Sequence, residues 1–280
     1  MKSTLDKRVT LIRGIHRRLK LDTEIEDGEV SGAVERLLKN EDVLSGLEKV
    51  TRELRTTAHE IKISVLRAFL SQLAKYGFLS PNVNYVDWCS GRGELAYSLA
   101  HLVGSQVVRS DRKFPKKNLL EEIFPCTKEY GITKVLFDLK SLASMEQVPN
   151  VPENPKGKVA YVGTYCCGSL PDLIVRYAQL QSEVPDFIAI LPCHHEKMDF
   201  ELSALAAKIK LDERLFALLT KASGHIRYSD GYHTVARRAM EVIDYFRAEN
   251  LKLLGYDAKV VRIYHPNVSP FNHMIIGVKN

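Results

Sequence analysis

Short apolar runs alternate with helical stretches from residue 84 to the end of the chain, and this alternation limits the possible folds most strongly. Candidate strands lie at 84–89, 106–110, 133–138, 158–164, 186–191, 258–264 and 273–278. Helical stretches between them include 92–103, 171–182, 201–221 and 234–254. The alternation predicts an α/β fold, in which a mostly parallel sheet carries helices on both faces.

The final pair of candidate strands sets the direction of the last strand. Only residues 265–272 join them, whereas parallel strands need a crossover of about a dozen residues or more. We therefore expect the last two strands to be antiparallel. A seven-stranded sheet that ends in such a hairpin is typical of the class I, Rossmann-like methyltransferases, and a plain dinucleotide-binding dehydrogenase usually lacks the hairpin. We expect this domain to span residues 78–280.

Residues 1–77 are expected to form a helical N-terminal extension. Its first helix shows apolar residues at helical spacing, and 61–76 carries a stronger apolar stripe. Residues 1–20 hold seven basic side chains against one acidic one, in a chain of net charge +6. Such a patch suits phosphate backbones and predicts RNA binding, with a solvated helix face as an equal alternative.

A second basic stretch lies at residues 109–117. It contains Arg109, Arg112, Lys113, Lys116 and Lys117 around a single acid. Because this stretch adjoins the candidate active site, we favour a nucleic-acid partner for it over a merely solvated face.

The composition favours a cytoplasmic globular protein without a membrane anchor. Hydrophobic residues make up 45% of the 280-residue chain, but the longest aliphatic runs are far too short to span a bilayer. The N-terminus is charged and lacks the apolar segment of a secretory signal. The five cysteines do not have the spacing of a small secreted scaffold, so we expect a reducing environment and free thiols.

A glycine turn leaves the first candidate strand and enters the next helix. It contains Asp87, Cys89, Gly91 and Gly93, and its glycines let the backbone turn tightly and approach a ligand closely. Asp111 follows Gly91 by twenty residues, at the end of the next strand. At this spacing an acid can accept hydrogen bonds from ribose hydroxyls.

Two further residues refine the prediction of the cofactor. Asp138 ends the third candidate strand, where an adenine amino group is often bound. Cys89 replaces the first glycine of a dinucleotide-binding fingerprint. This replacement argues against a pyrophosphate cradle and favours S-adenosylmethionine (SAM), which has no phosphate. A tight turn that binds no ligand is the alternative.

Two loops of unusual composition follow the fourth and fifth candidate strands, at 165–172 and 191–195. These strand ends should lie beside one another and beside the methyl donor. The candidate catalytic residues are Cys167, Asp172, His194 and His195. A histidine that acts as a general base contributes about 10²–10⁴-fold in rate. The alternatives are packing or phosphate binding for the histidines, of which we expect only one to face the acceptor, and helix capping for Asp172.

Zinc is the main competing interpretation of this cluster. Cys166, Cys167, Cys193, His194 and His195 supply enough ligands for a tetrahedral site. However, no C-x-x-C or H-x-x-x-H spacing is present, and the ligands are sequence neighbours. We therefore expect no metal. A disulfide between the adjacent Cys166 and Cys167 is a weaker alternative than zinc, because vicinal disulfides are strained.

The two loops resemble those of the tRNA 2′-O-methyltransferases that modify the fourth nucleotide of the acceptor stem. The matching motifs are Cys167-Gly168, Asp172-Leu173 and Cys193-His194-His195. The glycine turn before Asp111 also fits, as do Arg237-Arg238 and Ile243-Asp244 on one helix and the closing run 269–272. The likeness covers about residues 84–280.

The chain also departs from that family. Tyr165 stands where the family usually has a histidine, and Pro192 stands where it usually has the first of two cysteines. Larger members carry N-terminal cysteine/histidine zinc modules, whereas residues 1–77 contain no cysteine.

The resemblance implies SAM-dependent methylation of a ribose 2′-hydroxyl. The glycine turn, Asp111 and Asp138 would hold SAM, and the loops around Cys167, Asp172 and the two histidines would hold the nucleotide. The basic first helix would bind tRNA phosphates, since duplex RNA presents phosphates and 2′-hydroxyls rather than a readable major groove.

Three other functional classes compete with this one. The first is a SAM-dependent methyltransferase of a protein or small molecule, which the two basic stretches disfavour. The second is a non-catalytic RNA-binding subunit with a methyltransferase fold, which the set of Gly91, Gly93 and Asp111 disfavours. The third is a nicotinamide-dependent oxidoreductase, which Cys89 and the final hairpin disfavour.

Overall fold

One mixed sheet forms the centre of the molecule. The computed structural model describes residues 2–21, 26–27, 56–116, 131–144, 157–181, 184–201, 203, 212–224, 233–263 and 272–280. Its strands are β1 (Glu26–Asp27), β2 (Val83–Trp88), β3 (Val107–Asp111), β4 (Ile132–Leu136), β5 (Lys158–Cys166), β6 (Phe187–Pro192), β7 (Tyr256–Arg262) and β8 (His273–Lys279). Their order in the sheet is β1-β7-β8-β6-β5-β2-β3-β4.

The strand directions confirm the predicted fold class. Strands β2 to β6 are parallel to one another, whereas β8 lies between β6 and β7 and is antiparallel to both. All seven candidate strands are present, with ends shifted by a few residues. This is the α/β, Rossmann-like fold of class I methyltransferases, with a mostly parallel sheet and a reversed final strand. The short β1 adds an eighth, parallel strand beside β7.

Six helices and two short 3-10 turns surround this sheet in the described ranges. They are α1 (Lys2–Arg18), α5 (Thr56–Lys75), α6 (Glu94–Val103), α8 (Leu170–Leu180), α10 (Glu213–Ser223), α11 (His233–Leu253), η2 (Leu139–Ser144) and η3 (His195–Lys197). The C-terminal part of the predicted helix 201–221 corresponds to α10. Residues 202 and 204–211 lie outside the described part. No helix within the described ranges is long and apolar enough to cross a bilayer.

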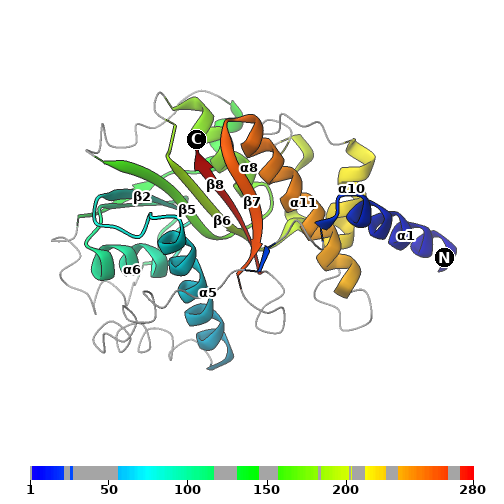
Figure 1. Ribbon diagram of the computed structural model, residues 1–280, viewed down its shortest axis with the longest axis horizontal. Helices are drawn as coiled ribbons and strands as arrows, with labels where there is room; N and C mark the ends of the chain where they lie inside the picture. Colours follow the sequence, from blue (N-terminus) through cyan, green and yellow to red (C-terminus); the bar gives the residue numbers. More distant parts are fainter. Residues whose placement is uncertain are drawn as a thin grey trace.

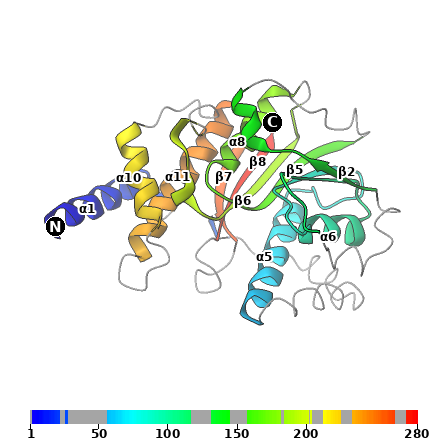
Figure 2. The same ribbon diagram turned by 180° about the vertical axis from the view of Figure 1, so that it is seen from behind.

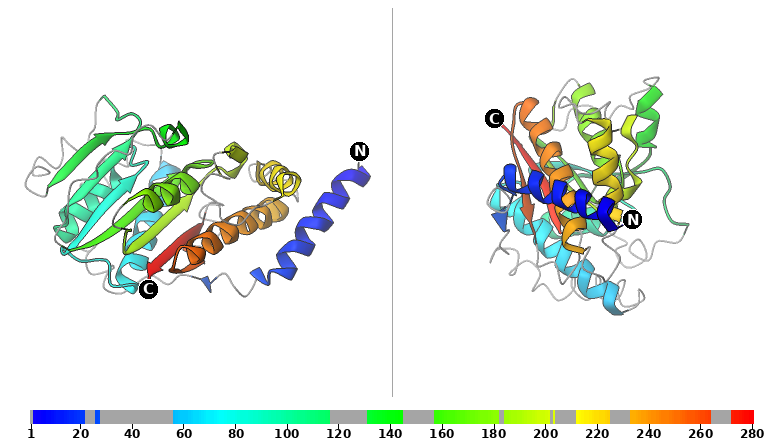
Figure 3. Two further views of the ribbon diagram at one scale, coloured as in Figure 1. Left: turned by 90° about the horizontal axis from the view of Figure 1, so that it is seen from above. Right: turned by 90° about the vertical axis from the view of Figure 1, so that its right-hand side faces the viewer.

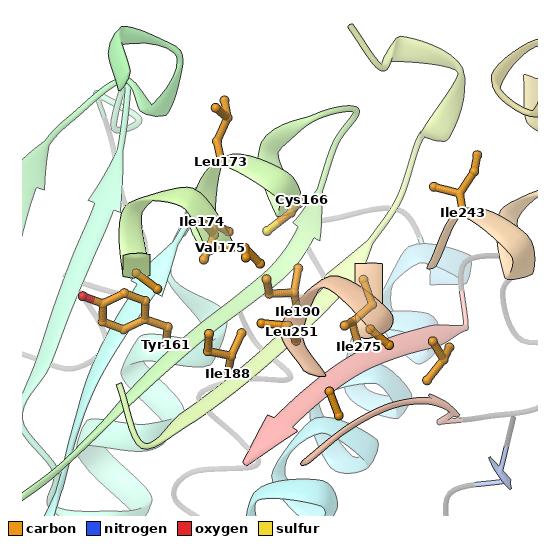
Figure 4. Close-up of a cluster of buried hydrophobic side chains, with 14 of the residues drawn as sticks. Tyr161, Cys166, Leu173, Ile174, Val175, Ile188, Ile190, Ile243, Leu251 and Ile275 are labelled. Atoms are coloured by element: carbon orange, nitrogen blue, oxygen red, sulfur yellow. The ribbon is translucent and has the colours of Figure 1, made fainter. Parts of the chain in front are cut away.

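Each face of the sheet carries its own hydrophobic core, because successive side chains of a strand point to opposite faces. In β6, Phe187 and Leu191 face α5 and α6, whereas Ile188 and Ile190 face α8 and α11. Figures 1 and 2 show these helices covering the two faces. Figure 4 shows the second core, where Ile190 packs with residues of α8 and α11. Strand β6, buried on both faces, therefore reads as a continuous apolar run in the sequence.

The N-terminal helices pack on these two cores, α1 on the one with α8 and α11, and α5 on the one with α6. Helix α1 lies along α11 at one end of the molecule (Figure 3), where Ile12 is buried and the His16 imidazole contacts the Glu241 carboxylate. Helix α5 buries Phe69 and Leu73 under the sheet. The prediction that residues 1–77 are helical is wrong at Glu26–Asp27, which form β1. The domain boundary at residue 77 stays a prediction.

Candidate functional site

The cofactor turn lies between β2 and α6 and contains an unusual run of left-handed backbone. Gly91 and Gly93 have φ angles of 53° and 90°, a region that glycine enters without a steric penalty. Cys89 has a φ of 57°, which is uncommon for a residue with a Cβ atom. Cys89 thus keeps the backbone conformation expected of the fingerprint's missing glycine. Strained residues of this kind concentrate at ligand sites.

Asp111 holds this turn in place from the end of β3. The backbone N–H of Gly91 donates to Asp111 Oδ2 at 2.9 Å, and that of Lys113 donates to Oδ1 at 3.2 Å. The structure therefore brings together the turn and the acid that the sequence paired by spacing. Each carboxylate oxygen has a second lone pair, so Asp111 can still accept from a ribose hydroxyl. Asp138 follows β4 at the same edge of the sheet, exposed, and accepts from Lys140 N–H at 3.0 Å.

Arg109 is a residue of this site that the sequence analysis assigned elsewhere. Its side chain is fully buried beneath the turn, so the prediction that it belongs to a surface patch is wrong. It donates to the Gly91 carbonyl and to the Tyr97 hydroxyl, each at 3.0 Å. Arg112, Lys113 and Lys116 of that stretch are exposed, and Lys117 lies outside the described residues.

Asp87 is a buried carboxyl group next to Arg109. Neither of its oxygens has a hydrogen-bond partner in the described part of the structure. Burial raises its pKa to about 8, although the positive charge of Arg109 and the backbone of Ala96 act in the opposite direction. At neutral pH this group is therefore largely protonated, and a cation that approached it would favour the charged form.

Replacing Asp87 by asparagine is expected to flatten the pH dependence of stability. The folded state holds the Asp87 proton up to about pH 8, while the ordinary pKa is 3.8. In the wild type this one group lowers the free energy of unfolding by up to about 1.4 kcal/mol per unit as pH rises between these values. Urea unfolding from pH 5 to pH 8 measures the slope. Asp257→Asn, on an exposed strand position, should keep the wild-type slope; an Asp87→Asn profile parallel to wild type contradicts the assignment.

The two acceptor loops lie side by side at the ends of β5 and β6. The Gly168 N–H donates to the His194 carbonyl at 2.8 Å, and the Cys193 N–H donates to the Cys166 carbonyl at 3.3 Å. Tyr165, in the first loop, has a left-handed φ of 57°. Burial raises the pKa of Tyr165 to about 12, so its phenol stays protonated and acts as a donor.

The three cysteines of these loops and Cys89 of the cofactor turn form two pairs. A disulfide joins Cys167 to Cys193, whose Cα atoms lie 5.1 Å apart, so the expectation of free thiols is wrong for this pair. Cys89 and Cys166 are free. The Cys166 thiol lies against the Cys89 thiol, and this contact and burial raise the pKa of Cys166. Four cysteines from three strand ends therefore meet at this edge of the sheet.

The two adjacent histidines point in different directions, as the sequence analysis expected. His195 is buried, and its Nε2 lies 2.7 Å from Asp244 Oδ1 on α11. His194 is half-buried, and its imidazole lies beside the sulfur atoms of Cys167 and Cys193. Of the two, only His194 lies at the disulfide, where the loops meet.

Asp172 belongs to a buried charge network that the sequence analysis missed. Its carboxylate pairs with the Arg247 guanidinium through Nε at 3.2 Å and Nη2 at 2.8 Å. Arg247 also donates to Asp244 Oδ1 at 3.1 Å and to the Gly168 carbonyl at 2.8 Å. Ser169, rather than Asp172, occupies the N-cap position of α8. The network thus links Asp172, the cysteine loop and His195 to one helix.

The electrostatics of this network favour charged groups in spite of burial. Burial alone would raise the pKa of Asp244, but His195, Arg247 and His273 together hold it below its usual range. Likewise, burial would lower the pKa of Arg247, and the two carboxylates raise it. The i,i+3 spacing of Asp244 and Arg247 places both on one face of α11, and is the one signal in the sequence that could have indicated the pair.

Several solved structures have a similar overall fold. Magnesium protoporphyrin IX methyltransferase from Synechocystis PCC 6803 aligns with 89% of this chain and 100% of its own, at 14% identity and a TM-score of 0.42. A putative SAM-dependent methyltransferase from Methanococcus maripaludis aligns with 86% of this chain and 95% of its own, at 15% identity and a TM-score of 0.41. No protein-family model and no curated protein matches the chain. At these scores the sheet order and strand directions, rather than the likeness, define the fold.

Proposed function

We propose that this chain is a SAM-dependent methyltransferase that modifies a ribose 2′-hydroxyl in the acceptor stem of tRNA. One observation carries the cofactor assignment: the left-handed turn after β2 is fixed to Asp111 at the end of β3. This occurs at the carboxyl edge of a sheet with the class I methyltransferase order. Open α/β sheets bind ligands at this edge. The resemblance of the two acceptor loops to the tRNA 2′-O-methyltransferases supports the choice of acceptor.

The residues of the turn fit the parts of SAM. Gly91 and Gly93 expose backbone to the ligand, and Asp111 is placed to accept from the ribose hydroxyls. Asp138, exposed at the end of the neighbouring strand, suits the adenine amino group. SAM carries a positive sulfonium and an ammonium group, and either of these near the buried Asp87 carboxyl would favour the charged form of that group. When bound, SAM supplies the electrophilic methyl group.

The acceptor loops divide into contact and positioning residues. Cys167 and His194 are partly exposed and would contact the nucleotide. His195 and Asp172 are buried in the network around Arg247 and would hold the loops in position. Holding the 2′-hydroxyl in line with the methyl group can supply much of the rate by itself.

The exposed face of α1 is the proposed contact to tRNA phosphates. Arg13, Arg17 and Arg18 are exposed on a helix whose other face packs on the domain. Changing all three to alanine is expected to weaken binding of tRNA, with a shallower salt dependence and unchanged SAM affinity. Filter binding at several salt concentrations measures this. A matched triple change of the exposed Lys158, Lys252 and Lys279, none of which lies on α1, should leave RNA affinity near wild type.

Methyl transfer from labelled SAM to unmodified tRNA transcripts tests the whole proposal. The expected product is label that resists alkaline cleavage at one acceptor-stem position, because a 2′-O-methyl group removes the nucleophile for that cleavage. Calorimetry with SAM is the companion measurement. Folded protein that binds neither SAM nor its demethylated product would overturn the cofactor assignment. SAM binding without label in any tRNA would move the acceptor to a protein or small molecule.

A further inference from the structure

Three metal-binding side chains meet where the two acceptor loops touch. The Sγ atoms of Cys167 and Cys193 and one imidazole nitrogen of His194 all lie within 4.8 Å of one another. Thiolate sulfur and imidazole nitrogen are the ligands that zinc prefers. Cys166 and His195, which the sequence analysis grouped with them, are turned away toward Cys89 and Asp244.

We propose that the reduced form of Cys167 and Cys193, together with His194, binds a zinc ion. Two-electron reduction of the disulfide by an added phosphine or dithiol reductant, with uptake of two protons, gives the two thiols. Zinc then binds both sulfurs as thiolates and releases those two protons to solvent. The metal and the disulfide are therefore alternative states of the same pair, and reduction decides which of them forms.

The loops that carry these ligands are held from outside the site. Two backbone hydrogen bonds join the loops, from Gly168 to the His194 carbonyl and from Cys193 to the Cys166 carbonyl. Arg247 holds the Gly168 carbonyl, next to Cys167, at 2.8 Å. His195, next to His194, is anchored on Asp244. Outer contacts that fix ligand orientation in this way typically raise metal affinity about 10–100-fold.

The ligand count indicates an open site. Among the described residues, no histidine, cysteine or acidic side chain joins these three as a fourth ligand. Two cysteines and one histidine with an exchangeable fourth ligand are a known catalytic zinc set, whereas structural sites are closed by four protein ligands. A ring nitrogen bound to zinc cannot accept a proton, so in the zinc form that nitrogen of His194 could not act as a general base.

Metal analysis of the reduced full-length chain tests this proposal without reference to methyl transfer. Protein purified in phosphine reductant should contain one zinc ion per chain, as measured by inductively coupled plasma mass spectrometry. Cys167→Ser, Cys193→Ser and His194→Ala should each lose most of it. Cys89→Ser, which removes a free cysteine outside the group, should keep it. Circular dichroism confirms that each variant is folded.

Cobalt is the second probe, since it reports on ligand type. Reduced, metal-free protein titrated with Co²⁺ should develop a thiolate-to-cobalt charge-transfer band that zinc abolishes. Protein with both thiols reactive toward a thiol reagent, but with no bound zinc and no cobalt band, would overturn the proposal and leave a disulfide only. Zinc that persists in all three ligand variants would also overturn it.

Discussion

Replacing Arg247 by methionine is expected to lower the free energy of unfolding by about 3–5 kcal/mol at pH 7, because it leaves buried charges without a partner. The guanidinium makes ion pairs to Asp172 and Asp244, at 2.8 and 3.1 Å, and both carboxylates are buried. Methionine fills a similar volume, so most of the loss is electrostatic. Urea unfolding followed by circular dichroism measures it.

The pH dependence separates this cause from a packing defect. Without Arg247 the pKa of Asp244 rises, so its protonation at lower pH removes an unpaired buried charge. The deficit relative to wild type should therefore shrink as pH falls toward 4. A deficit that is constant with pH would mean that lost packing, rather than charge, destabilises the variant. Adding Asp172→Asn to the variant should recover part of the loss, since one buried charge is then removed.

An exposed ion pair on the same helix provides the control. Lys252 and Glu249 are 2.7 Å apart at i,i+3 spacing, but Lys252 is half exposed. Solvent screens such pairs, so Lys252→Met should change the free energy of unfolding by less than about 1 kcal/mol. Equal losses in the two variants would contradict the view that burial makes the Arg247 network important.

The sheet could be predicted from the sequence because its signal is local. Strand β6 and the middle of β5 are buried on both faces, so they appear as short apolar runs between loops. The reversed β8 followed from the length of a single connection. The expectation that the glycine turn and Asp111 share one site followed from spacing, since the turn and the next strand end are fixed by the same βαβ unit.

The partners inside the site could not be predicted in the same way. His195 and Asp244 are 49 residues apart, and Arg247 reaches Asp172 over 75. No local sequence pattern indicates contacts between residues so far apart in the chain. Arg109 illustrates the same limit. The basic composition of residues 109–117 suggested a surface patch, but in the interior the Arg109 guanidinium donates to the Tyr97 hydroxyl and the Gly91 carbonyl, both from other elements.

Changing Gly93 to alanine is expected to weaken SAM binding about 100-fold with the domain still folded. A Cβ atom there would lie 2.5 Å from Arg109 Nε, in a residue whose φ is +90°. Backbone strain and overpacking each cost about 1–3 kcal/mol, and about 3 kcal/mol corresponds to that loss of affinity. Calorimetric titration with SAM measures the effect.

Gly104→Ala is the matched control for this variant, because it separates backbone strain from crowding. Gly104 caps the other end of the same helix with a φ of +73°, but nothing lies within 4 Å of its would-be Cβ. It should lose stability, by about 1 kcal/mol, and keep its SAM affinity. The two variants should differ because of Arg109. A Cβ atom at Gly93 would push away the guanidinium that donates to the Gly91 carbonyl, and this would disturb the turn that Asp111 fixes. Equal SAM affinity in both variants would mean that this turn does not contact the cofactor.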